Sequence, residues 1–296
     1  MIRLLSTLLI GVSSGAIYSL MALALVLVWR STRVVNFAQA GQAILSTYIG
    51  YEVLTHVNNF WIALLVATIA GACVGALVDV LLIRRLARVS GASANVRPVI
   101  ATLGLLGLIS SGVGLIWGND LKRIATPVGT HGYTFGHTTI PFSPFNLLIV
   151  ATAALVMAIF ALIFQRTNLG LALRASAFAP ETARLAGVRV DRTRTIGWAF
   201  AGAAGAVAGL MITPQSALAP NSMDLLLVLG FVAAVIGGLD SLIGAGIGGL
   251  ILGIGLALIL EYVSTSLAFP AAFIVLIIVL LIRPQGLLGK LRGRDV

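Results

Sequence analysis

Long runs of apolar residues alternate with short polar stretches along the whole chain. A membrane-spanning helix needs roughly 20 mostly apolar residues to cross about 30 Å of hydrocarbon. Nine segments approach or exceed this length, and each is predicted to form a helix: 8–29, 37–57, 61–83, 99–117, 145–164, 196–212, 225–239, 243–260 and 267–282. We expect eight or nine of these segments to cross a membrane.

Two of the nine segments differ from the others. Segment 37–57 carries Gln39, Gln42 and Glu52 among its apolar residues, and segment 225–239 is short and ends in two glycines. Broken or re-entrant helices are tolerated only where protein or a water-filled cavity satisfies the freed backbone groups. Each of these two segments is therefore expected either to cross fully or to enter the membrane as a broken helix.

Composition supports an integral membrane protein of the all-α class. The 296 residues are 59% hydrophobic and only 9% charged, whereas soluble domains have about 45–50% apolar and about 25% charged residues. So few charges cannot cover a surface that faces water. We expect a polytopic transmembrane helix bundle that forms a single domain over residues 1–296, without a separate soluble domain.

The basic residues indicate the orientation of the chain in the membrane. There are 19 Lys and Arg against 9 Asp and Glu. If stretch 165–195 is cytoplasmic and every segment crosses, all basic residues except Arg3, Lys122 and Arg123 lie on the cytoplasmic side. This bias satisfies the positive-inside rule and places the N-terminus outside and the C-terminus in the cytoplasm. Topology thus explains the positive charge, which argues against a nucleic-acid partner.

Acidic residues are sparse in the apolar segments. Charged groups at mid-membrane are costly and usually functional. All five, however, lie near segment ends or in a turn, and we expect them to be interfacial and solvated: Glu52, Asp79, Asp224, Asp240 and Glu261. Asp79, for example, precedes Arg84 by about 7.5 Å along a helix. The absence of an acid–base chain through the membrane argues against a proton-coupled carrier.

No catalytic or metal-binding motif stands out in the sequence. The histidines His56, His131 and His137 fall in or beside predicted outside loops and lack the spacing of metal ligands. The nearest match to a phosphate-binding loop, at 286–290, has the wrong spacing. We therefore expect the chain to be no enzyme and to bind no cofactor or metal. If ATP powers transport, another subunit must bind the nucleotide.

Glycines recur four residues apart in several segments, as in Gly71 and Gly75 or Gly205 and Gly209. This spacing puts both glycines on one helix face, where the missing side chains let two backbones approach closely. We favour tight helix packing within one subunit over a dimerisation face.

The polar stretch 165–195 contains the signals of a short helix. Pro180 suits the first helical position, Glu181 suits the positive N-terminal dipole, and Gly187 suits a helix stop. The sequence predicts a two-turn helix over 180–186 at the cytoplasmic membrane surface. This helix is either an ordinary interfacial helix anchored by arginines or a rigid knob that fits a groove in a cytoplasmic partner.

Five stretches, in the same order along the chain, resemble one transporter family. They are 15–23, 35–39, Arg174-Ala175 followed by Ala183, Ala186 and Gly187, 231–249, and 283–289. They are similar to ABC importer permeases of the branched-chain amino acid (LivH/LivM type) family, and the resemblance covers nearly the whole chain. Where LivH-like members commonly have His-Gly-Glu, this chain has Gln39-Ala40-Gly41.

The resemblance implies a permease subunit of an ATP-driven importer. Its partners would be a second homologous permease, two cytoplasmic ABC ATPases that use ATP, and an extracytoplasmic solute-binding protein. Stretch 165–195 would be the loop that couples the permease to the ATPases, through Arg174, Pro180, Glu181, Ala183, Ala186 and Gly187. The solute would be a branched-chain amino acid or a related small amino acid or amide, because relatives carry several such solutes.

Polar residues on two segments are candidates to line the translocation path. Asn36, Gln39 and Gln42 belong to the second segment, and their carboxamides are costly in apolar surroundings without partners. Thr102 and Ser110 belong to the fourth segment. Because Ser and Thr often bond back to their own helix, these two are equally well explained as structural.

An ion-gradient-driven secondary transporter of small solutes is the main alternative. It predicts activity from this chain alone and discontinuous helices around a mid-membrane ion site. A channel would require a repeated filter sequence or a charged ring, and a membrane enzyme would require a catalytic set. The sequence shows neither feature.

Overall fold

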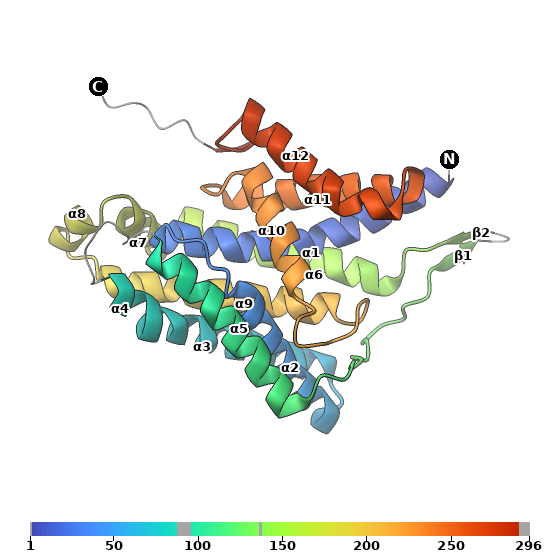
Figure 1. Ribbon diagram of the computed structural model, residues 1–296, viewed down its shortest axis with the longest axis horizontal. Coiled ribbons are helices and arrows are strands. Elements are labelled where there is room, and N and C mark those ends of the chain that lie inside the picture. Colours follow the sequence, from blue (N-terminus) through green and yellow to red (C-terminus); the bar gives the residue numbers. More distant parts are fainter. Residues whose placement is uncertain (1, 88–95, 136–137, 290–296) are drawn as a thin grey trace. The chain divides into compact units, whose positions relative to one another are not determined.

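The computed structural model describes residues 2–87, 96–135 and 138–289 (Figure 1). Five residues used in the sequence analysis lie outside these ranges: Arg88, His137, Lys290, Arg292 and Arg294.

Each of the nine predicted segments forms a helix, which confirms the all-α class. The helices are α1 (Ile2–Thr32), α2 (Gln39–Val57), α3 (Phe60–Val78), α5 (Arg97–Trp117), α6 (Pro144–Arg166), α9 (Val190–Ile212), α10 (Asp224–Gly237), α11 (Leu242–Tyr262) and α12 (Ala268–Ile282). Within the described ranges, six are long and apolar enough to cross a membrane: α1, α3, α5, α6, α9 and α11. The helix α10 and the 270–282 part of α12 are shorter apolar helices.

The two segments that differed in sequence are each one continuous helix. α2 runs without interruption for 19 residues, and α10 runs for 14 residues up to the first of its two glycines. Neither helix is therefore broken inside its own length. The number of crossings stays a prediction for these two helices.

The remaining elements are short. A π-helical turn, η1 (Asp79–Ile83), extends α3 and leads into α4 (Arg84–Ala87). Stretch 165–195 folds into α7 (Asn168–Phe178) and α8 (Pro180–Leu185), and η2 (Thr265–Leu267) precedes α12. An antiparallel hairpin pairs β1 (Tyr133–Phe135) with β2 (Thr138–Ile140), with Tyr133 opposite Ile140. The sequence analysis predicted only α8 among these.

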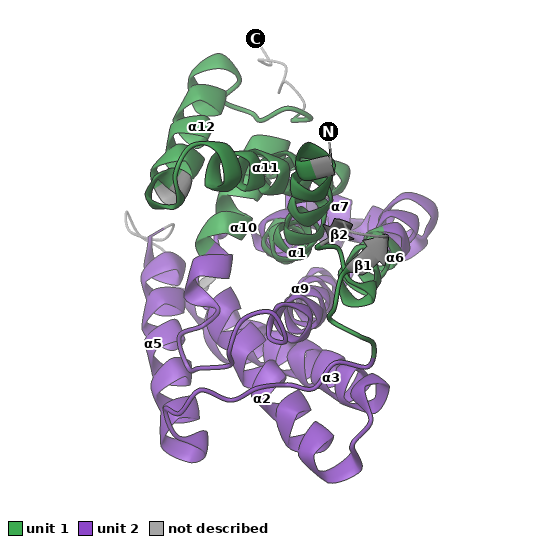
Figure 2. Cartoon of the chain, turned by 90° about the vertical axis from the view of Figure 1, so that its right-hand side faces the viewer, with its two compact units in different colours: residues 1–26, 128–157, 228–296 green, residues 27–127, 158–227 purple. Residues whose placement is uncertain are grey.

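The chain forms two compact units, each built from separate stretches of sequence (Figure 2). Unit 1 contains residues 1–26, 128–157 and 228–296, and unit 2 contains residues 27–127 and 158–227.

In unit 1, glycines allow α11 to approach α1. A Cβ added at Gly15 would lie 2.8 Å from the carbonyl oxygen of Gly249, and the Ser19 hydroxyl donates to the carbonyl of Gly246 at 2.8 Å. The segment after α12 returns to the end of α10, where the Leu287 amide donates to the carbonyl of Ile236 at 2.8 Å.

In unit 2, α2, α3 and α9 pack against one another, and α5 packs on α2. The contact between α3 and α9 is made backbone to backbone, because Cβ atoms at Gly71 and Gly75 would collide with the carbonyls of Gly202 and Trp198. Trp198 itself is fully buried. The glycine spacing therefore serves helix packing within the chain, as predicted.

Candidate functional site

The polar side chains at the start of α2 are buried inside unit 2. Asn36 and Gln39 are both fully buried. The Asn36 Nδ2 donates to Gln39 Oε1 at 3.0 Å, and Gln39 Nε2 donates to the carbonyl of Ala201 on α9 at 2.9 Å. A side chain at Gly205 would collide with Gln39 Nε2. Gln39 is thus held between α2 and α9 in a space that a glycine leaves open.

Gln42 lies one turn further along α2 and has a different environment. It is fully buried, yet neither its carboxamide oxygen nor its nitrogen has a hydrogen-bond partner among the described residues. The same holds for Asn36 Oδ1 and for the hydroxyl of Tyr48, two turns beyond. Buried polar groups are nearly always paired with protein or water. Water or a polar solute would complete the hydrogen bonds of these groups on and beside α2.

The two candidates on α5 are separated by the structure. Thr102 is fully buried, donates to the carbonyl of Val99 at 2.9 Å, and accepts the Phe37 amide at 3.4 Å. It therefore lies against the turn that precedes α2. Ser110 is eight residues, or about 12 Å, further along the helix, and lines an open pocket of about 640 Å³ with Asn119 and Asn221.

The short helix in stretch 165–195 begins at the predicted residue and ends at Leu185, one residue before the predicted end. α8 begins at Pro180, and Gly187 follows it with a φ of +83°. The amides of Gly187 and Val188 bond to the carbonyls of Arg184 and Ala183 at 3.0 and 2.9 Å. These bonds satisfy the helix end in the manner of a glycine C-cap.

Pro180, Ala183 and Ala186 are three residues apart, so helical spacing alone predicts that they share one face of α8. Ala183 is only 5% exposed, so its side chain packs within the chain itself, whereas Pro180 and Ala186 are exposed. The three residues therefore do not form one outward face. The outward face carries Leu185, which is 91% exposed. Arg174 on α7 is also exposed.

An open pocket of about 440 Å³ lies beside α8. Four arginines from separate parts of the chain line it: Arg33 directly after α1, Arg84 on α4, Arg184 on α8 and Arg194 on α9. Two carboxylates, Glu181 and Asp191, also line it. Sequence reasoning missed this pocket because its arginines are far apart along the chain and follow no motif.

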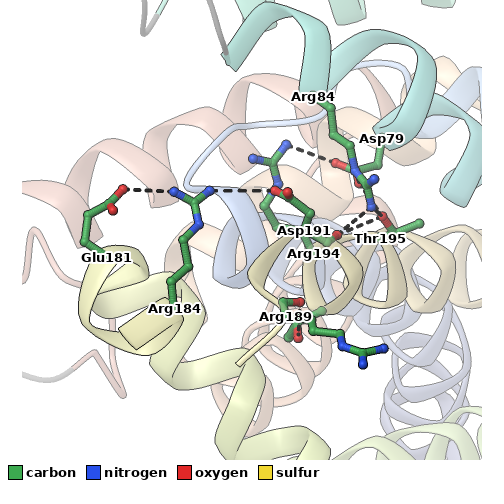
Figure 3. Close-up of polar contacts among 9 residues, drawn as sticks. Asp79, Arg84, Glu181, Arg184, Arg189, Asp191, Arg194 and Thr195 are labelled. Carbon is green, nitrogen blue, oxygen red and sulfur yellow. Dashed lines mark hydrogen bonds and ion pairs between the residues drawn. The ribbon is translucent and has the colours of Figure 1, made fainter. Parts of the chain in front are cut away.

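The expectation that Asp79 is solvated is wrong. Asp79 is fully buried in the η1 turn. Its carboxylate binds Arg84 Nε at 3.2 Å, Arg194 at 3.1 Å and the Thr195 hydroxyl at 2.6 Å (Figure 3). A buried carboxylate is stable only when paired and hydrogen-bonded, and α9 supplies two of these three donors. In the sequence, the only indication of this buried ion pair was a single acidic residue in an otherwise apolar helix.

The other four acidic residues are exposed, as predicted: Glu52, Asp224, Asp240 and Glu261. Glu52, for example, accepts the indole N–H of Trp117 at 3.0 Å and pairs with His56 at 3.3 Å.

Comparison with known proteins identifies similar permeases. A family model described as "Branched-chain amino acid transport system / permease component" matches residues 7–282. The probable branched-chain amino acid transport permease protein LivH of Methanocaldococcus jannaschii is 33% identical over 285 residues, which cover 91% of this chain and 88% of that protein.

Two bacterial proteins show similar coverage. The high-affinity branched-chain amino acid transport system permease protein LivH of Escherichia coli K12 is 29% identical over 291 residues, covering 95% of this chain and 94% of that protein. The permease BraD of Pseudomonas aeruginosa, of the same description, is 28% identical over 290 residues with the same coverage. No solved structure matches the chain.

Proposed function

The chain belongs to the family of branched-chain amino acid transport system permease components, and we propose that it is the permease subunit of an ATP-driven ABC importer. The observation that carries this proposal is the family match over residues 7–282, which includes all nine predicted helices. The apolar helices and the permease relatives indicate a multi-pass protein of the plasma (inner) membrane.

In this proposal the chain works in a larger assembly. A second homologous permease completes the translocation path, two cytoplasmic ABC ATPases bind and hydrolyse ATP, and an extracytoplasmic binding protein delivers the solute. The chain itself is then a transport subunit without enzymatic activity and without a bound cofactor or metal. The lack of a phosphate-binding loop in the sequence supports this division of labour.

The proposed path runs along the polar side of α2. Asn36, Gln39 and Gln42 place carboxamide groups there, and Thr102 lies beside the start of α2. The Gln39 carboxamide is already bonded to Asn36 and Ala201, so it would shape the path and not bind the solute directly. The unpaired carboxamide of Gln42 supports this assignment most directly, since a passing solute or water would complete its hydrogen bonds. Ser110 enters the proposal only as a residue of the open pocket further along α5.

The proposed ATPase contact is the segment formed by α7 and α8. Proline and glycine ends make α8 a short helix of defined length, and exposed Leu185 and Phe178 offer apolar side chains for a groove. Arg174, Pro180, Glu181 and Ala186 add exposed groups around them, while Ala183 and Gly187 hold the helix in place. Stretch 165–195 and the C-terminus would then face the cytoplasm, with the N-terminus outside.

The proposed solutes are branched-chain amino acids or related small amino acids and amides. The names of the relatives described above refer to branched-chain amino acids. A buried carboxamide, with one donor and one acceptor group, suits a solute that carries both kinds of group.

Reconstitution tests this function. The chain would be co-expressed and purified with a second permease, two ABC ATPases and a solute-binding protein. Uptake of labelled leucine, isoleucine, valine and urea into proteoliposomes would be measured with and without ATP. We expect ATP-dependent uptake that requires the binding protein and disappears when the ATPases carry an inactivating substitution. Uptake by the chain alone, driven by a proton or sodium gradient, would overturn the proposal in favour of a secondary transporter.

A further inference from the structure

The buried carboxylate of Asp79 connects two membrane helices at one end of unit 2. Two of its three donors, Arg194 and Thr195, lie in the first turns of α9, and the third, Arg84, lies just beyond η1 on its own helix. The arginine side chains are only 27% and 17% exposed, so solvent screens these contacts weakly. Ionic hydrogen bonds of this kind are stronger and more directional than neutral ones.

The same cluster continues to α8. Arg84 also donates to the backbone carbonyl of Asp191 at 2.6 Å. The carboxylate of Asp191 pairs with Arg184 at 3.8 Å, and Arg184 pairs with Glu181 at 3.0 Å (Figure 3). Polar contacts therefore connect α8, the start of α9 and the end of α3, with the exposed Arg184–Asp191 pair as the weakest link.

The backbone follows the same route. α8 ends at Leu185 and α9 begins at Val190, so only four residues separate the two helices. Within this connection Val188 bonds back to the carbonyl of Ala183, and the Val190 amide bonds to the carbonyl of Val188, both at 2.9 Å. A displacement of α8 must therefore move the first turn of α9.

The π-helical turn places Asp79 in this arrangement. A π turn adds a residue to the helix and rotates the residues that follow, and such turns are frequent at functional sites. Here η1 begins at Asp79 and ends at Ile83, directly before Arg84. The π turn therefore separates Asp79 from Arg84 along the helix, and the Arg84 side chain points back to bind the Asp79 carboxylate.

We propose that Asp79 is a positioning residue for energy coupling, which joins the end of α3 to the start of α9 through Arg194 and Thr195, and from there to α8 through Asp191 and Arg184. Movement of α8 then displaces α3 and α9 as one body, because the two helices are also in backbone contact at Gly71 and Gly202. This inference rests on the proposed function, since it assumes that an ATPase moves α8. Without the Asp79 contacts, the backbone contact at Gly71 and Gly202 would still hold the middle of the two helices together, but the ends of α3 and α9 beside α8 would no longer be fixed to each other.

The test compares uptake with ATP hydrolysis in the reconstituted full transporter. For Asp79→Asn we expect ATPase subunits to co-purify normally and ATP to be hydrolysed, but solute uptake per ATP to fall at least tenfold. The matched control is Glu52→Gln, the same carboxylate-to-carboxamide change at an exposed acid of unit 2 outside this cluster. Glu52→Gln should keep the same solute uptake per ATP as the parent transporter. Adding Arg194→Gln to Asp79→Asn should lower the ratio little further, because the pair is already broken.

Two milder variants keep the test decisive if Asp79→Asn fails to fold. Asp79→Glu retains the charge and should recover part of the uptake per ATP. Thr195→Val removes the 2.6 Å hydrogen bond to Asp79 and the hydroxyl's contacts with Arg84 and the Asp191 carbonyl, but keeps both arginines beside Asp79. It should give an intermediate uptake per ATP. If uptake and hydrolysis fall in parallel with the amount of folded complex, Asp79 only stabilises the fold and the inference is wrong. Failure of the proposed function would look different, because the parent transporter itself would show no ATP-driven uptake.

Discussion

A Cβ atom added at Gly71 of α3 would lie 2.5 Å from the carbonyl oxygen of Gly202 on α9. The two helices touch through their backbones at this point, and no side chain stands between them. Within a lipid bilayer the hydrophobic effect does little to hold helices together, so close backbone packing of this kind is a main source of their stability.

We predict that Gly202→Ala destabilises the protein by about 1–3 kcal/mol, the usual range for an added carbon in a packed contact. Its Cβ would collide with the Gly71 carbonyl, which cannot rotate away. The measurement is the thermal unfolding temperature of the detergent-purified protein. Gly104→Ala on α5 is the control, because a Cβ there meets nothing within 4 Å. A drop of equal size in both variants would mean that the α3–α9 contact is not tight.

Two neighbouring glutamines on α2 should respond in opposite ways to the same substitution. Gln39→Leu removes the hydrogen bond to the Ala201 carbonyl, leaves the Asn36 amide nitrogen without its partner, and should cost about 1–3 kcal/mol. Gln42→Leu removes a carboxamide that has no partner among the described residues, so stability should be unchanged or higher. Uptake should nevertheless fall for Gln42→Leu if it lines the path. Unfolding curves and uptake of both variants check this. Equal destabilisation would show that Gln42 is bound like Gln39.

The exposed residue Leu185 should matter for the ATPase contact. Leu185→Glu puts a charge on a side chain that is 91% exposed, so the free permease should keep its stability. Co-purification of the ATPases and ATP-driven uptake should both drop sharply. Ala183→Trp should instead destabilise the permease itself, since Ala183 is buried within the chain. If the Leu185→Glu variant assembles and transports normally, α8 does not bind the ATPases and only anchors the chain at the membrane surface.

Gly187 allows a separate test of the connection between α8 and α9. Its φ is +83°, and a Cβ there would meet nothing within 4 Å, so only backbone strain can oppose substitution. Gly187→Val should cost about 1–3 kcal/mol and reduce uptake. Gly187→Asn should be milder, because Asn tolerates the left-handed region. Identical uptake for the two variants would contradict a role for this turn geometry.

Cysteine labelling tests the orientation. Cys73 is the only cysteine, so single cysteines can be placed in a Cys73→Ser background. An impermeant maleimide should label Thr130→Cys in intact cells and Leu185→Cys only after permeabilisation, since both positions are exposed. The opposite pattern would reverse the predicted topology.

The sequence alone determined the helices and the ends of α8. Apolar runs of a given length form helices in a membrane whatever surrounds them, and Pro180 and Gly187 act within a single turn of chain. Glycine spacing likewise indicated which helix faces approach closely. These are local properties, and short stretches of sequence contain them completely.

Only the tertiary structure decided which polar groups are paired. Arg84 lies five residues from Asp79, but Arg194 is 115 residues away, so the sequence around Asp79 does not show the second arginine or the burial of the carboxylate. Gln39 and Gln42 look alike in sequence, yet α9 provides a carbonyl to the first and none to the second. Ala183 faces inward for the same reason. Burial and hydrogen bonding depend on which helices pack together, and that is a property of the whole fold.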